Sequence, residues 1–139
     1  MFKNILLAVD GSQHSLKAAI LAADMARLNQ AKLRIVVVFD SVPAYLGEPF
    51  FQHAVSARFK EANKILEQAI KRVEDIPKGV QTEVLEGPPA EAILEISKTR
   101  NNDLIVMGTR GLGRLSGLLL GSQSQKVVAH AQCPVLLVR

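Results

Sequence analysis

What the sequence lacks already limits the kind of protein it encodes. It has a single cysteine, Cys133, so no disulfide can form within the chain, and the following Pro134 and apolar run favour a packed small side chain over a nucleophile. No apolar run approaches the roughly 18 residues of a membrane-spanning helix. The run from Ile5 to Val9 is too short for a signal-peptide core and is closed by Asp10, so we expect a cytoplasmic protein.

Aromatic side chains are also scarce. One Tyr and five Phe accompany a formal charge of +4, and the Lys and Arg residues are scattered along the chain. Because a nucleic-acid surface needs clustered cations and aromatic platforms, that class of partner is disfavoured. The cations that do gather are Arg110, Arg114 and Lys126, which surround a glycine-rich stretch and favour a compact anion.

Strand-like and helical patterns alternate along all 139 residues, which we expect to form one domain spanning 1–139. The predicted strands are Ile5–Val9, Leu33–Phe39, Val80–Glu86, 103–107 and Val135–Val138. This alternation predicts an α/β fold: a doubly wound, five-stranded parallel sheet with helices on both faces. We favour the strand order 3-2-1-4-5, in which the ligand-binding switch point lies between the first and fourth strands.

The predicted helices differ in how clearly the sequence marks them. Ser12 is a suitable N-cap for the first helix. Pro and Gly residues indicate a loop over 41–51, and helical periodicity then runs from Val55 to Val73. A short helix after Ser122 is expected to turn three side chains inward, those of Val127, Val128 and Ala131.

A glycine pattern directly follows the fourth strand. It reads Gly108-x-x-Gly111, then nine residues, then Gly121-Ser122. Glycines let backbone N–H groups approach a phosphate, Arg110 adds charge, and a helix starting at Ser122 adds free N–H groups. The stretch lacks the lysine of a Walker loop and the spacing of a dinucleotide fingerprint. The alternative is a plain loop with a capping box between Ser122 and Gln125. The arginines and the switch point favour phosphate binding.

Asp10 closes the first strand, where it serves either as a turn former or as an acceptor for a ribose hydroxyl. Its place at the switch point favours the ribose. The histidines His14, His53 and His130 are not spaced as metal ligands, so we interpret them as structural or solvated. A catalytic triad is excluded for Asp10, Ser12, His14 and Ser15. These residues share one turn, where they cannot be arranged as nucleophile, base and orienting acid.

Six segments together resemble the universal stress protein family, in its ATP-binding branch. They are Val9-Asp10-Gly11-Ser12-x-x-Ser15, Val38-Phe39-Asp40, Gly87-Pro88, Met107-Gly108-Thr109-Arg110-Gly111, Gly121-Ser122, and 133–138. The resemblance implies a Rossmann-like fold similar to the adenine nucleotide alpha hydrolases. It implies that Asp10 holds the ribose and that Val38 contacts adenine through its main chain, with Ala8 nearby. It places Gly108, Gly111, Gly121 and Ser122 on the phosphates, with Met107 and Gln123 adjoining.

We therefore expect an ATP-binding regulatory protein of the stress response, with Mg²⁺ or Mn²⁺ carried on the phosphates. ADP and AMP stay open as ligands. The rivals are a slow ATPase or nucleotidyl transferase, for which only Asp10 and His14 offer a base, and a ligand-free dimeric interaction module. The last strand is apolar on both faces and lies at a sheet edge, so residues 134–138 predict a homodimer. Segment 41–58 has no assigned role.

Overall fold

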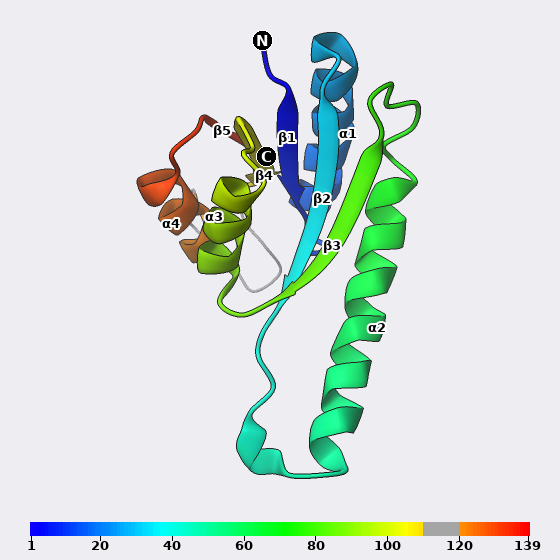
Figure 1. The fold of residues 1–139 in the computed structure, drawn as a ribbon, viewed down its shortest axis with the longest axis vertical. Helices are drawn as coiled ribbons and strands as arrows, with labels where there is room; N and C mark the ends of the chain where they lie inside the picture. Colours follow the sequence, from blue (N-terminus) through cyan, green and yellow to red (C-terminus); the bar gives the residue numbers. More distant parts are fainter. Residues whose placement is uncertain (110–119) are drawn as a thin grey trace.

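The computed structural model describes residues 1–109 and 120–139. Figure 1 shows a parallel sheet in the order β3-β2-β1-β4-β5, which confirms the predicted α/β topology. The elements in chain order are β1 (Asn4–Ala8), α1 (Gln13–Asn29), β2 (Lys32–Phe39), the 3-10 helix η1 (Ala44–Leu46), α2 (Phe50–Ile70), β3 (Val80–Glu86), α3 (Pro89–Thr99), β4 (Leu104–Gly108), α4 (Ser122–His130) and β5 (Val135–Val138).

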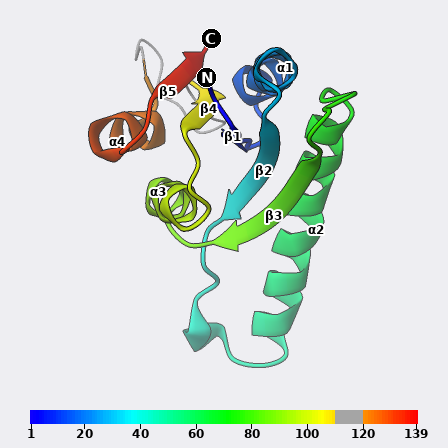
Figure 2. The same ribbon diagram turned by 45° about the horizontal axis from the view of Figure 1, so that its top comes forward.

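The strands are apolar on both sides because helices cover both faces of the sheet. Ile5 and Leu7 of β1 pack with α1 and α2, whereas Leu6 and Ala8 pack with α3 and α4. Figure 2 shows these two helix pairs on opposite sides of the twisted sheet. Each fully buried Leu or Ile stabilises the fold by about 1.5–3 kcal/mol. Continuous apolar runs are thus what a doubly covered parallel sheet requires.

The first helix lies close against the sheet because its inner face is built from alanine. The buried side chains of this face are those of Ala18, Ala19, Ala22, Ala23 and Ala26. The Ser12 hydroxyl accepts a hydrogen bond from the N–H of Ser15 at 3.2 Å, so Ser12 is the N-cap that the sequence predicts.

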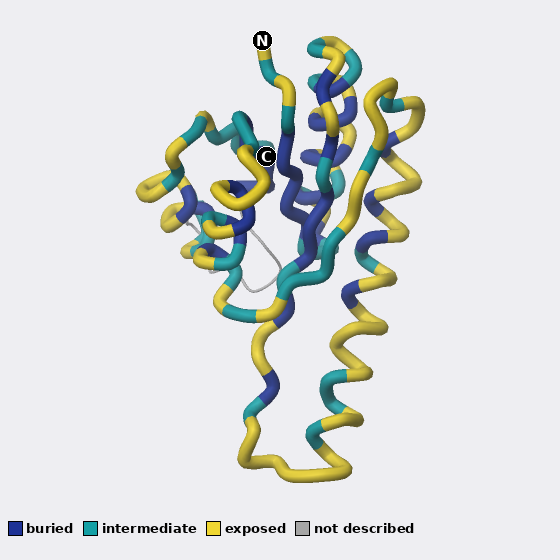
Figure 3. The backbone as a smooth tube through the Cα atoms, in the orientation of Figure 1, coloured by how far each residue is buried: buried dark blue, intermediate teal, exposed yellow. Residues whose placement is uncertain are grey.

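Segment 41–58, called the arm from here on, projects beyond the end of the sheet and is largely exposed (Figures 1 and 3). The helix α2 begins at Phe50, close to the predicted end of the loop at about Phe51, but it ends at Ile70, so the helical run predicted to Val73 is too long. The first turns of α2 lie in the arm, where they cover no part of the sheet. Phe51, Ala54 and Val55 lie on one side of these turns at helical spacing and are half-buried.

The short helix α4 corrects two expectations. Val127 is buried and Ala131 packs beside it, but Val128 is 47% exposed, so its predicted inward orientation is wrong. Gly121 occupies the N-cap position, and the amide of Gln125 donates to the Leu120 carbonyl at 3.2 Å. The capping box between Ser122 and Gln125 is therefore not formed.

Cys133 behaves as the small packed side chain that the sequence predicts. It lies against the cluster under α3 and α4, and burial, followed by the nearby Asp103 carboxylate, raises the pKa of its thiol. Within residues 1–109 and 120–139, no helix has the length and apolar character needed to cross a membrane.

Candidate functional site

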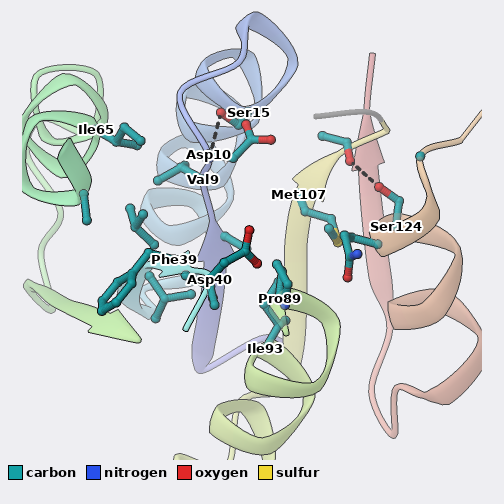
Figure 4. A pocket seen from close by; sticks show the side chains of 18 of the residues that line it. Val9, Asp10, Ser15, Phe39, Asp40, Ile65, Pro89, Ile93, Met107 and Ser124 are labelled. Atoms are coloured by element: carbon teal, nitrogen blue, oxygen red, sulfur yellow. Dashed lines mark hydrogen bonds between the residues drawn. The ribbon is translucent and has the colours of Figure 1, made fainter. Parts of the chain in front are cut away.

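A pocket of about 570 Å³ opens at the carboxyl ends of β1, β2 and β4. It lies at the switch point, with residues of the β1–α1 turn on one side and the start of α4 on the other. Figure 4 shows Asp10 and Asp40 at the ends of neighbouring strands, with Met107 and Ser124 across the pocket from them. The volume is in the range of small-ligand sites.

The β1–α1 turn fixes the Asp10 carboxylate in this pocket. Gly11 has a φ of +86°, a conformation that side-chain-bearing residues rarely adopt, and it turns the chain sharply into α1. Asp10 Oδ1 accepts from the N–H of Ser12 at 2.9 Å, and the N–H of Asp10 donates to Ser15 Oγ at 3.3 Å. Asp10 is thus a turn former, and its carboxylate also lines the pocket.

The end of β2 presents an open stretch of main chain. The register between β1 and β2 ends with Ala8 opposite Val36, and the N–H of Val9 donates to the Val36 carbonyl at 3.0 Å. Alternate residues of a strand direct their N–H and C=O groups to the same side. Those of Val38 therefore point past the end of β1, and no described residue supplies a partner to either group. This donor and acceptor pair lies in the pocket wall.

Gly108, at the end of β4, allows α1 to approach closely. A Cβ at this position would lie 2.8 Å from His14 Cβ and 3.0 Å from the His14 carbonyl carbon. The Gly108 carbonyl also accepts a hydrogen bond from the buried Ser124 hydroxyl at 2.9 Å. The packing of α1 alone thus requires glycine here, a reason that the phosphate argument did not include.

The start of α4 forms the opposite wall. The N–H of Gln125 makes the first backbone bond of the helix, to the Gly121 carbonyl at 3.0 Å. The N–H groups of Ser122, Gln123 and Ser124 consequently have no partner within the helix, and their residues line the pocket. Such a helix start attracts an anion. The Gln123 side chain is used otherwise, because its Oε1 accepts from the N–H of Ala90 at 3.0 Å and caps α3.

The structure brings most of the predicted site residues into this one pocket. The lining includes Ala8, Asp10, Val38, Met107, Gly108, Gly121, Ser122 and Gln123. Arg110, Gly111 and Arg114 lie outside the described residues. Lys126, expected near the glycine stretch, lies 3.9 Å from the Glu91 carboxylate and does not line the pocket.

The wall formed by α2 is the part that sequence reasoning missed. Arg58, Glu61, Ala62 and Ile65 line the pocket from this helix, and Asp40 lines it from the end of β2. Asp40 could have been found, because it closes its strand as Asp10 does. No local pattern marks the residues of α2, since they reach the pocket only through the packing of the helix on β2 and β3.

A search for known relatives places the chain in a family. The model of the universal stress protein family matches residues 1–139. The chain belongs to the universal stress protein family. A Thermus aquaticus protein named "universal stress protein in QAH/OAS sulfhydrylase 3′ region" is 51% identical over 142 residues, and the match covers all of both chains.

Solved universal stress proteins share the fold. The protein UspA from Lactobacillus plantarum has a TM-score of 0.89 and 29% identity, over 99% of this chain and 98% of that one. A universal stress protein from Archaeoglobus fulgidus, solved in complex with dAMP, has a TM-score of 0.70 and 20% identity, over 100% and 98% of the two chains. At that lower identity the similarity establishes the fold alone.

Proposed function

We propose that the pocket binds ATP and that the protein is a nucleotide-sensing regulatory module rather than an enzyme of rapid turnover. The observation that carries the proposal is the open main chain of Val38, which faces the same pocket as the free N–H groups of α4. Adenine offers a matching acceptor and donor on one edge. The A. fulgidus relative, which binds dAMP, supports an adenine nucleotide as the ligand.

The remaining groups of the nucleotide have places between these two walls. The Asp10 carboxylate accepts the ribose hydroxyls, and Ala8 and Met107 pack beside the base and sugar. The phosphates pass close to Gly121 and meet the N–H groups of Ser122 and Gln123, where the positive end of the α4 dipole adds to the attraction. We propose that Arg110 and Gly111, which lie outside the described residues, also contact the phosphates.

A divalent cation fits this pocket as an ion carried on the phosphates. Among the described residues, no group of three His, Cys, Asp or Glu side chains is placed to hold a metal by itself. The lining carries negative charge from Asp10, Asp40 and Glu61 and a positively charged side chain from Arg58. Mg²⁺ or Mn²⁺ would offset the repulsion between these carboxylates and the phosphates.

Binding rather than turnover is proposed because neither candidate base is assigned to the phosphates: Asp10 accepts the ribose hydroxyls in this proposal, and His14 does not line the pocket. Asp10 Oδ1 accepts from the Ser12 N–H, and the His14 ring is hydrogen-bonded to Thr109. A hydrolase needs a base or a water-orienting group that is free beside the γ-phosphate.

Calorimetry of ATP binding by a Gly121→Val variant tests the site. Gly121 has a φ of −71° and a ψ of 161°, an ordinary extended conformation, so a side chain there does not strain the backbone. We expect Val at this position to block the phosphate contact and weaken ATP binding by more than tenfold. Gly121→Ala, with one small added group, is the graded control. Equal binding by the wild type and Gly121→Val would show that the site is wrong.

The same proposal includes the assembly and location expected from the sequence. We propose that residues 1–139 form one domain, because both hydrophobic clusters are built on the same sheet. We propose that two copies pair through residues 134–138 at the open edge of β5, and that the protein is cytoplasmic.

A further inference from the structure

One hydrogen bond between side chains connects the two halves of the pocket. The β1–α1 turn carries Asp10, and the β4 end with α4 carries Gly108 and Gly121. Across the gap between them, Nδ1 of His14 lies 2.9 Å from Oγ1 of Thr109. His14 belongs to the first turn of α1, and Thr109 directly follows β4.

Thr109 is a junction between several elements of the structure. It is 6% exposed, and its N–H donates to the Val138 carbonyl of β5 at 2.8 Å. Its carbonyl accepts from the N–H of Gly121 at 2.7 Å, which fixes the N-cap residue of α4. A displacement of Thr109 therefore passes directly to the helix start that offers N–H groups to an anion.

We infer that His14 is a positioning residue that holds the phosphate half of the pocket in register with the Asp10 half. This inference rests on the proposed ATP site and adds a residue that lies outside the pocket lining. The close contact at Gly108 involves the Cβ and backbone of His14, which any non-glycine residue at position 14 retains. Among residues 1–109 and 120–139, only the bond to Thr109 depends on the imidazole.

The position of this bond predicts a selective effect on ligands. In the proposed site the polar adenine contacts come from β2, Ala8 and Met107 pack beside the base, and Asp10 holds the ribose. None of these residues is hydrogen-bonded to Thr109. The phosphates contact Gly121 and Ser122, whose placement depends on Thr109. A shift of a few tenths of an ångström weakens these hydrogen bonds without altering the nucleoside contacts.

The experiment compares the affinities for ATP and adenosine, by calorimetry and NMR titration, in variants of both partners. His14→Leu and Thr109→Val each remove the bond, and Thr109→Val keeps the side-chain shape. We expect each to raise the Kd for ATP about threefold to tenfold, the effect of one hydrogen bond, with the Kd for adenosine unchanged. The double variant should be no weaker than either single one. His14→Asn and Thr109→Ser keep polar atoms in place and should restore ATP binding.

Three results would overturn the inference. They are unchanged ATP affinity in Thr109→Val, equal losses for ATP and adenosine, and additive losses in the double variant. If His14→Leu fails to fold, the pair Thr109→Val and Thr109→Ser decides alone. A wild-type protein that binds neither ligand would refute the proposed nucleotide site, and the role of His14 would fall with it, which separates this failure from the other three.

Discussion

Glycine residues in this chain are required for different physical reasons. Gly11 supplies a positive φ, and a Cβ added there would also lie 3.3 Å from Ile65 Cγ1. Gly108 has an ordinary φ but no room for a side chain beside His14. Gly121 has an ordinary extended backbone, so its conformation does not require glycine. The predicted phosphate loop thus contains at least one glycine, Gly108, that packing against α1 alone requires.

Gly108→Ala tests the packing role at this scale. Its Cβ meets the backbone of α1, which cannot move without disturbing the helix, so we expect a loss of about 1–3 kcal/mol in the free energy of unfolding. Urea denaturation measures it. Gly79→Ala is the control, because Gly79 has a φ of +90° and a Cβ added there would meet no atom within 4 Å, so this variant reports backbone strain without a clash. A neutral Gly108→Ala would contradict the steric argument.

At the scale of elements, side-chain hydrogen bonds cap the start of α1. Ser12 accepts from the Ser15 N–H, and the Ser15 hydroxyl donates to the Ser12 carbonyl at 2.9 Å. Both serines are buried beside the pocket. The turn that holds Asp10 and the start of the helix are consequently one hydrogen-bonded unit.

We expect Ser12→Ala to lower the free energy of unfolding by about 1 kcal/mol, because the N–H of Ser15 loses its acceptor. Thermal or urea denaturation checks the value. Ser12→Asn, which retains a capping oxygen, should stay within a few tenths of a kcal/mol of the wild type. If both variants lose the same amount, the hydroxyl is needed for packing rather than for the cap.

The elements also show what the sequence could and could not predict. The five strands, their order and the switch point followed from apolar runs and short connections, since these patterns report burial directly. The end of α2 at Ile70 was missed because the apolar spacing continues to Val73, which is buried although it lies beyond the helix. Val128 was misplaced because α4 buries only the stripe of Ser124 and Val127, which is narrower than its apolar residues suggest. The contact of His14 with Thr109 joins residues 95 positions apart, and no local pattern reports it.

At the scale of the whole molecule, the two edges of the sheet differ. β3 carries polar residues at four of its seven positions, as an edge facing water does, whereas β5 is apolar throughout. The carbonyl of Pro134 accepts from the N–H of Ile105 in β4, and the carbonyl of Val138 accepts from the N–H of Thr109, directly after β4. By the alternation of a strand, the N–H groups of Val135 and Leu137 point to the open edge. These are the groups that a second copy would pair.

Leu137→Pro is therefore a clean test of the homodimer. It removes an N–H from the open edge and leaves the ladder to β4 intact, so we expect a folded monomer. Light scattering gives the mass, and circular dichroism the fold. Leu136→Pro is the matched control, because it removes a group that faces β4 and should destabilise the sheet itself. A wild-type mass of one subunit at micromolar concentration would rule the dimer out.

The length of α2 has a consequence for how occupancy of the pocket spreads through the molecule. The helix runs without interruption from the exposed arm to the residues Arg58 to Ile65 that line the pocket. Its outer turns have little buried contact and open by local unfolding at low free energy, while the turns beside the pocket open at higher free energy. A bound nucleotide would raise the free energy of each local unfolding event that removes the α2 residues from the pocket, because such unfolding requires the nucleotide to dissociate. We therefore expect ATP to slow amide exchange in the turns of α2 beside the pocket and to leave exchange at the tip of the arm unchanged.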